Sequence, residues 1–220
     1  MTNIQSEVTN FIEQDVSIRR GLSRELLNIR ALAKYIQQNL QLSCSLDAVI
    51  SAIRRYEGRE EQKEDIKMRY KLIASSKVSS RTRIASLLFK KHMDVRNNLI
   101  GLYKKIDFSK GEILRILEVS EYIKIIIDEA NLEKATDACG KKDVVQVEHN
   151  LGEISILYAD IVKQTPGIFA ALSSELALSG ISIVDGVICG NEHIFIVNED
   201  DLMKALGALH RISKWGAKVS

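Results

Sequence analysis

Apolar positions in the first 60 residues recur at helical spacing. Residues 17–26 suit a helix, and in residues 29–40 the apolar side chains fall on one face after Asn28, a good capping residue. The segment LSCS then interrupts the pattern. Ser45 begins a third predicted helix, with Asp47 in its first turn, where a negative charge suits the helix dipole. The side chains on its predicted buried face are Leu46, Val49, Ile50, Ile53 and Tyr56.

The solvent face of this third helix is basic, because Ser51, Arg54, Arg55 and Arg59 fall on or beside it. Two helices joined by a short turn, the second with exposed arginines, are typical of a helix-turn-helix. The same arrangement also occurs in dimerisation and docking modules. The pattern therefore leaves DNA binding, protein interaction and a purely structural role open.

A basic strand is predicted after these helices. EEQKEDIKMRYKLIASS (60–76) suits another helix, and KVSSRTRIASLLF (77–89) alternates like a strand that carries Lys77, Arg81 and Arg83. This arrangement resembles winged helix-turn-helix domains over residues 15–90. The resemblance implies that the strand is the wing and that its cations contact phosphates.

The last 70 residues alternate between strand and helix patterns. GEISILYAD (152–160) is a predicted strand, and Thr165 is the predicted cap of a helix that has Pro166 near its first turn and ends at Gly180. Two short apolar strands joined at the turn 190–191 follow, and then a helix with an acidic start. The predicted order is β-α-β-β-α.

This order, with a Pro-Gly pair at its first helix, resembles the ACT domain, the small regulatory domain of aspartokinases and other enzymes of amino-acid metabolism. The resemblance covers residues 152–215. It implies a ferredoxin-like βαββαβ unit whose ligand lies between units, across a dimer interface. The residues that carry it are Thr165-Pro166-Gly167-Ile168, residues 178–183, residues 194–201 and residues 205–210.

The preceding segment repeats this pattern. Residues 111–140 parallel the second half of the ACT-like stretch, residues 93–107 match its first helix, and residues 143–150 would be a closing strand. His92-Met93-Asp94 replaces the Pro-Gly pair, so this unit is degenerate. The segment 80–92 is assigned both to a wing and to a sheet strand, and the sequence leaves this open.

The predicted fold class is α+β. The predicted domains are a helical winged-helix-like domain (1–79), a degenerate ACT-like unit (80–150) and an ACT-like unit (151–220). The last unit lacks an evident fourth strand, which KWGAKVS would supply unless it extends the final helix.

The Pro-Gly turn predicts a ligand site. Backbone N–H groups at the start of the helix would meet a ligand carboxylate, because a helix N-terminus favours an anion. Asp160 or Asp185 would accept hydrogen bonds from the ligand ammonium. The simpler interpretation is that the turn only begins a helix. The predicted ligand-binding residues are Asp160, Thr165, Pro166, Gly167, Ile168, Phe169, Ile183 and Asp185.

Composition adds a charge asymmetry. Residues 1–92 hold 17 Lys/Arg and 10 Asp/Glu, a net charge of +7, and residues 93–220 hold 14 and 19, a net charge of −5. The basic part is therefore the better candidate for a polyanionic partner, although such differences between domains are common.

Several function classes are disfavoured. No apolar run is long enough for a transmembrane helix, and the polar N-terminus is not a secretory signal. Three well-separated cysteines argue against a disulfide framework and for a cytoplasmic setting. The four histidines lack metal-site spacing and are expected at surface or edge positions. No nucleotide-binding glycine motif occurs, so we expect no cofactor, no catalytic site and no metal site.

The sequence therefore predicts a non-enzymatic, cytoplasmic regulator. It would sense a small metabolite, an amino acid by the ACT resemblance, and would contact DNA through its N-terminal part. The alternative is a regulatory or docking subunit of an amino-acid-biosynthetic enzyme that does not bind DNA. We also expect a homodimer with a two-fold interface through the C-terminal part, because the sheet of the last unit looks incomplete.

Overall fold

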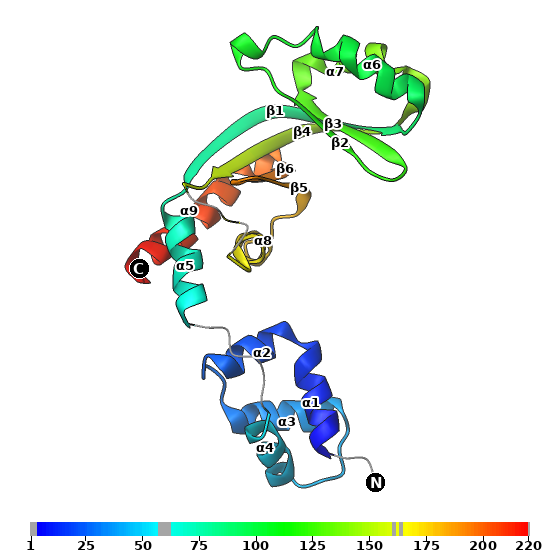
Figure 1. Cartoon of the computed structure of the whole chain (residues 1–220). Coiled ribbons are helices and arrows are strands. Elements are labelled where there is room, and N and C mark those ends of the chain that lie inside the picture. The colour runs from blue at the N-terminus through cyan, green and yellow to red at the C-terminus, as the bar shows by residue number, and fades with distance from the viewer. Residues whose placement is uncertain (1–3, 57–62, 160–161, 163–164, 220) are drawn as a thin grey trace. The chain divides into compact units, whose positions relative to one another are not determined.

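The computed structural model describes residues 4–56, 63–159, 162 and 165–219. The chain divides into two compact units, Met1–Ile66 and Lys67–Ser220 (Figure 1).

The first unit is helical, and its helices start where the sequence supplies capping side chains. Asn28 Oδ1 accepts a hydrogen bond from the backbone N–H of Ala31, and Ser45 Oγ accepts one from Ala48, so both predicted caps are confirmed. Asp15 caps the helix that begins at Val16 by accepting hydrogen bonds from the backbone N–H groups of Ser17 and Ile18. The helices are α1 (Ile4–Gln14), α2 (Val16–Ser23), α3 (Ile29–Asn39) and α4 (Leu46–Arg54).

The core of this unit uses the stripe predicted for α4. Val49 and Ile53 are buried against α3 and α1. Helix α1 was not predicted, yet its Val8 and Ile12 are fully buried. The sequence did carry a signal, since Ile4, Val8, Phe11 and Ile12 recur at helical spacing in this segment.

The second unit is α+β and alternates strands with helices. Its sheet is antiparallel throughout and has the order β2-β3-β1-β4-β6-β5. In chain order the elements are α5 (Lys63–Ala74), β1 (Lys77–Lys90), α6 (Met93–Tyr103), β2 (Leu114–Glu118), β3 (Tyr122–Asp128), α7 (Leu132–Cys139), β4 (Val144–Leu157), α8 (Ile168–Leu178), β5 (Ile183–Cys189), β6 (Glu192–Asn198) and α9 (Leu202–Val219).

Strands β1 and β4 are 14 residues each and serve both halves of the sheet. The second half of β1 pairs with β3, and the second half of β4 pairs with β6. Figure 1 shows both strands running from the α6/α7 half to the α8/α9 half. The expected boundaries at 79/80 and 150/151 therefore fall inside shared strands.

The fourth strand that the last unit lacked in the sequence comes from the start of β1. Residues 77–81 pair with residues 153–157 of β4. Residues 214–219 of the stretch KWGAKVS continue α9 instead of forming a strand.

A bulge in each long strand keeps the apolar faces aligned. Arg83 (φ 56°) and Asn150 (φ 54°) adopt left-handed backbone conformations, and the pairing register shifts between Arg81 and Ile84. Because one extra residue reverses the side-chain alternation, both halves direct their apolar positions toward helices. The Arg83 N–H donates to Glu199 Oε2 at 2.8 Å, which supports the bulge.

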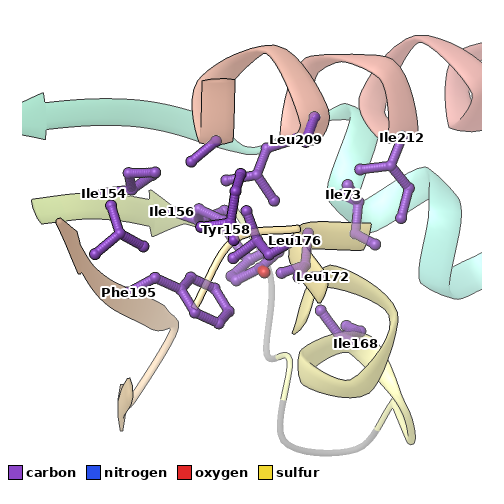
Figure 2. Packing of buried hydrophobic residues seen from close by; sticks show 14 of the residues in the cluster. Ile73, Ile154, Ile156, Tyr158, Ile168, Leu172, Leu176, Phe195, Leu209 and Ile212 are labelled. Carbon is purple, nitrogen blue, oxygen red and sulfur yellow. The ribbon is translucent and has the colours of Figure 1, made fainter. Parts of the chain in front are cut away.

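Two apolar clusters lie beneath the helices. One packs α6 and α7 against Leu87 and Phe89 of β1 and against Ile123, Ile125 and Ile127 of β3. The other packs α5, α8 and α9 against Ile154, Ile156 and Phe195, as Figure 2 shows.

The opposite sheet face is enclosed because the sheet curls. Ile84, Ile126 and Ile196 from both halves share one buried cluster there. Lys124 of β3 reaches Asp185 of β5, although three strands separate these elements in the sheet.

Candidate ligand-binding site

The turn before α8 is built around a glycine. Gly167 has φ +82° and is the N-cap residue of α8, and no side chain among the described residues caps this helix. Glycine adopts this conformation without the Cβ strain that other residues meet. The prediction that Thr165 caps the helix is therefore wrong. Thr165 lies two residues before the cap, and its backbone N–H donates to the Val162 carbonyl.

The start of α8 leaves backbone donors without intrahelical partners. The first helical hydrogen bond runs from Ala171 N–H to the Gly167 carbonyl at 2.9 Å. The amides of Ile168 and Phe169 precede that bond, and such groups need an acceptor from outside the helix. Together with the helix dipole, they favour an anion at this end.

A cavity of about 270 Å³ lies beside this turn. Four of the predicted ligand-binding residues line it: Thr165, Gly167, Ile168 and Phe169. Its other lining residues are Val162, Ile188, Gly190 and His193. The lining is thus mainly apolar, with polar groups at the helix start and at one histidine.

His193, one of the lining residues, is buried, contrary to the expectation from the sequence. We expected all four histidines at surface or edge positions, and the other three are exposed, but His193 is only 3% exposed. A signal was present in the sequence: His193 has the same strand parity as Phe195 and Val197, which both face the core.

One ring nitrogen of His193 is already bonded. Its Nδ1 lies 3.1 Å from the Tyr158 hydroxyl. Burial raises the pKa of Tyr158, so the hydroxyl keeps its proton, and it either donates to Nδ1 or accepts from Nδ1–H, depending on the tautomer of the ring. In the tautomer that accepts from Tyr158, the ring proton is on Nε2, which has no hydrogen-bond partner within the described part of the chain. The same burial lowers the pKa of His193, so the ring is neutral near pH 7.

Aromatic packing holds this wall of the cavity. Phe169 stacks on Phe195 with a centroid separation of 5.0 Å and an interplanar angle of 17°, and it meets His193 edge-on at 5.8 Å. A Cβ on Gly186 would lie 3.0 Å from Phe169 Cζ, so the absence of a side chain at 186 makes room for the phenyl ring.

Arg69 of α5 covers the turn from another side. Its Nε donates to the Pro166 carbonyl at 2.9 Å, and its guanidinium Cζ lies 3.0 Å from the place a Gly167 Cβ would occupy. The side chain is 5% exposed. Nothing in the local sequence of α5 indicates this contact, because the partners are 97 positions apart.

Three more of the predicted ligand residues do not line the cavity: Pro166, which lies in the same turn, Ile183 and Asp185. Ile183 packs at the edge of the core cluster. Asp185 was expected to accept from a ligand ammonium, but its carboxylate receives two hydrogen bonds from Lys124 Nζ, at 2.7 and 2.9 Å, on the enclosed sheet face. Asp160 lies outside the described residues.

The same enclosed face holds a buried ion pair. Arg115 donates from Nε and Nη2 to the two oxygens of Glu153, each at 2.7 Å. The Glu153 side chain is 2% exposed and that of Arg115 is 29% exposed. The hydrogen bond to Glu153 is also the main cause that raises the pKa of Arg115. The pair joins β2 of one half to β4 of the other.

The predicted DNA-contact residues fall on both units. Ser51, Arg54 and Arg55 are exposed on or next to α4, as expected, and Arg59 lies outside the described residues. Lys77, Arg81 and Arg83 belong to β1, a sheet strand of the second unit. Arg81 donates to the Gly111 carbonyl at 2.9 Å. Residues 77–81 are thus the fourth strand described above, and Arg83 lies in the bulge that follows it.

Other site chemistry is limited. Within the residues that the structure describes, no group of three or more His, Cys, Asp or Glu side chains could hold a metal ion. Cys44, Cys139 and Cys189 are free thiols. None of the helices in the described ranges is both long and apolar enough to cross a membrane.

Comparison with known proteins gives matches in structure only. No protein-family model and no curated protein sequence matches the chain. The ligand-free regulatory subunit of aspartate kinase from Thermus thermophilus matches with a TM-score of 0.50 and 13% identity, over 61% of this chain and 95% of that one.

Whole aspartate kinases match over a smaller part of their length. The Synechocystis enzyme has a TM-score of 0.52 and 16% identity, over 64% of this chain and 27% of its own. The Clostridium acetobutylicum enzyme has a TM-score of 0.52 and 11% identity, over 61% of this chain and 34% of its own. The chain thus spans about a third or less of these enzymes. The shared feature is the fold, and these matches agree with the ACT-type α+β fold expected from the sequence.

Proposed function

We propose that this chain, whose second unit has an ACT-type regulatory fold, is a non-enzymatic regulator that binds a small amino acid beside the N-terminus of α8. The observation that carries the proposal is a cavity at which two kinds of donor converge. These are the amides at the start of α8 and, in the tautomer whose Nδ1 accepts from Tyr158, the Nε2–H of His193. Both suit a carboxylate.

The rest of the cavity suits the body of such a ligand. Phe169, Ile188 and Val162 offer apolar contact, and about 270 Å³ is close to the lower end of volumes typical of small-molecule pockets. The ligand carboxylate lies against the helix start, and its side chain lies against the apolar lining. Asp160 remains the predicted acceptor for the ammonium group.

The direct test is thermal denaturation of the full chain with each of the twenty amino acids in turn. A ligand at 100 times its dissociation constant adds about 2.7 kcal/mol to the free energy of unfolding. The carboxamide derivative of any amino acid that stabilises the protein should do so much less, because it lacks the anion. His193→Asn should reduce the stabilisation, and His149→Asn, at an exposed histidine, should not. If no amino acid stabilises the chain, the proposal fails.

The proposal divides the chain as the sequence suggested. We keep the division into residues 1–79, 80–150 and 151–220 as a proposal, in which α5 and the start of β1 pack with the second unit and the two ACT-like units share their long strands. We favour a role as a regulatory subunit that docks on an amino-acid-biosynthetic enzyme. The similarity to the Thermus thermophilus protein, which is itself a regulatory subunit, supports this role. Copurification of the chain with a candidate enzyme would test this role.

A homodimer belongs to the same proposal, for a revised reason. β1 completes the sheet of the last unit, so an incomplete sheet no longer argues for pairing. The sheet still ends at β2 and β5, and exposed edges are the usual place for a second chain to add strands. Light scattering at tens of micromolar should give twice the chain mass, and a monomer there would contradict the dimer.

DNA binding through Ser51, Arg54 and Arg55 is the competing prediction, and the comparisons give it no support. Contact with phosphates would weaken steeply with salt, by about 0.9 in the log–log slope for each phosphate neutralised. The double variant Arg54→Ala, Arg55→Ala should lower that slope. Absence of binding at low salt favours the docking role.

A further inference from the structure

Helix α5 is anchored in the core of the second unit. Leu72 is 3% exposed and Ile73 is 2% exposed, and both belong to the cluster beneath α8 and α9. Figure 2 shows Ile73 among the side chains of these two helices. In the chain, α5 also follows the helices of the first unit, so it is the element through which the two units are connected.

Arg69 brings this helix to the turn that forms one wall of the cavity. Its Nε–H bonds to the Pro166 carbonyl, and its Nη2 and Cζ both lie 3.0 Å from the place of a Gly167 Cβ. The lack of a side chain at 167 therefore serves two purposes: it permits φ +82°, and it leaves room for the guanidinium.

The charges at this point have the same sign. The guanidinium of Arg69 is positive, and the N-terminus of α8 carries the positive end of the helix dipole. A carboxylate bound in the cavity would be attracted by both. It would therefore favour the arrangement in which α5 is docked.

We infer that Arg69 is a positioning residue of this site, and that docking of α5 and occupancy of the cavity stabilise each other. The inference rests on the function proposed above. Because coupling between two binding events is reciprocal, docked α5 raises the ligand affinity by the same factor by which the ligand favours docking. Ligand binding would thereby stabilise the docked position of α5, the helix by which the chain passes from the first unit into the second.

The first test needs no ligand. Hydrogen exchange is measured by mass spectrometry on the full chain for wild type, Arg69→Met and Lys71→Met, which changes an exposed cation on the same helix. Loss of a buried, charged hydrogen bond should speed exchange by about tenfold to a hundredfold. We expect this in residues 68–74 and in the first turn of α8 for Arg69→Met only. Faster exchange confined to α5, or equal effects in both variants, would overturn the positioning role.

The second test adds each of the twenty amino acids as probes. An amino acid that raises the melting temperature of wild type should also slow exchange in residues 68–74, and Arg69→Met should lose this protection while Lys71→Met keeps it. A stabilising amino acid that leaves exchange in α5 unchanged overturns the coupling but not the proposed function. If no amino acid stabilises wild type, the proposed function fails, and the ligand-free measurement alone decides whether Arg69 positions the turn.

Discussion

The stability of the second unit should fall in mild acid because of His193. The ring is 3% exposed and packs between Tyr158 and Phe169, which are neutral. Burial lowers the pKa of His193 below its ordinary value, so the folded protein binds a proton less readily than the unfolded chain. Its contribution to stability is therefore complete above the unfolded pKa and is lost as the pH falls toward the folded one.

The size of the effect follows from this burial. If the folded ring stays neutral, protonation of the unfolded histidine, with a pKa of about 6.5, lowers the free energy of unfolding by about 2 kcal/mol between pH 8 and pH 5. This value is an upper limit, because any protonation of the folded ring reduces it. The local slope cannot exceed about 1.4 kcal/mol per pH unit for one proton.

Urea denaturation at several pH values between 8 and 5 measures the effect in wild type, His193→Asn and His149→Asn. The asparagine at 193 keeps an acceptor for Tyr158 but cannot titrate, so its stability should fall less in acid. Tyr158→Phe should retain the pH dependence, since the histidine stays buried. A stability difference between wild type and His193→Asn that is constant from pH 8 to pH 5 would refute the reasoning.

Two further substitutions test the enclosed sheet face and the α8 turn. Arg115→Met leaves the buried Glu153 carboxylate unpaired and should cost about 3–5 kcal/mol in urea denaturation, whereas adding Glu153→Leu should restore most of the loss. A small cost for the single variant would show that water reaches the carboxylate. Gly167→Ala should cost about 1–3 kcal/mol, because alanine resists φ +82° and its Cβ meets Arg69. Gly101→Ala, in a helix with open space around the glycine, should stabilise by about 0.5–1 kcal/mol. Equal effects of the two alanines would contradict the role assigned to Gly167.

Much of this molecule could be predicted from local patterns. Asn28 and Ser45 cap helices where the sequence places a short polar side chain before an apolar stripe. The strand and helix alternation of the last 70 residues also matches the observed elements. These features depend on neighbours within a few residues, so they can be predicted from the sequence alone.

Parts of the candidate site could be predicted from the sequence in the same way. Thr165, Gly167, Ile168 and Phe169 lie at the cavity because a single turn places them there. The burial of His193 could also have been predicted from its alternation with Phe195, had strand parity been weighed above residue type.

The rest depends on contacts between distant segments. Pairing along β4 makes residues 77–81 a sheet strand, although their basic composition is equally typical of a wing. The curl of the sheet assigns Asp185 to Lys124, 61 positions away, and helix packing places Arg69 over the Pro166 carbonyl. Local periodicity specifies which face of an element is apolar, but it carries no information on which other element covers that face. That choice depends on how well whole surfaces fit once the chain is compact, so these partners were decided only in the folded unit.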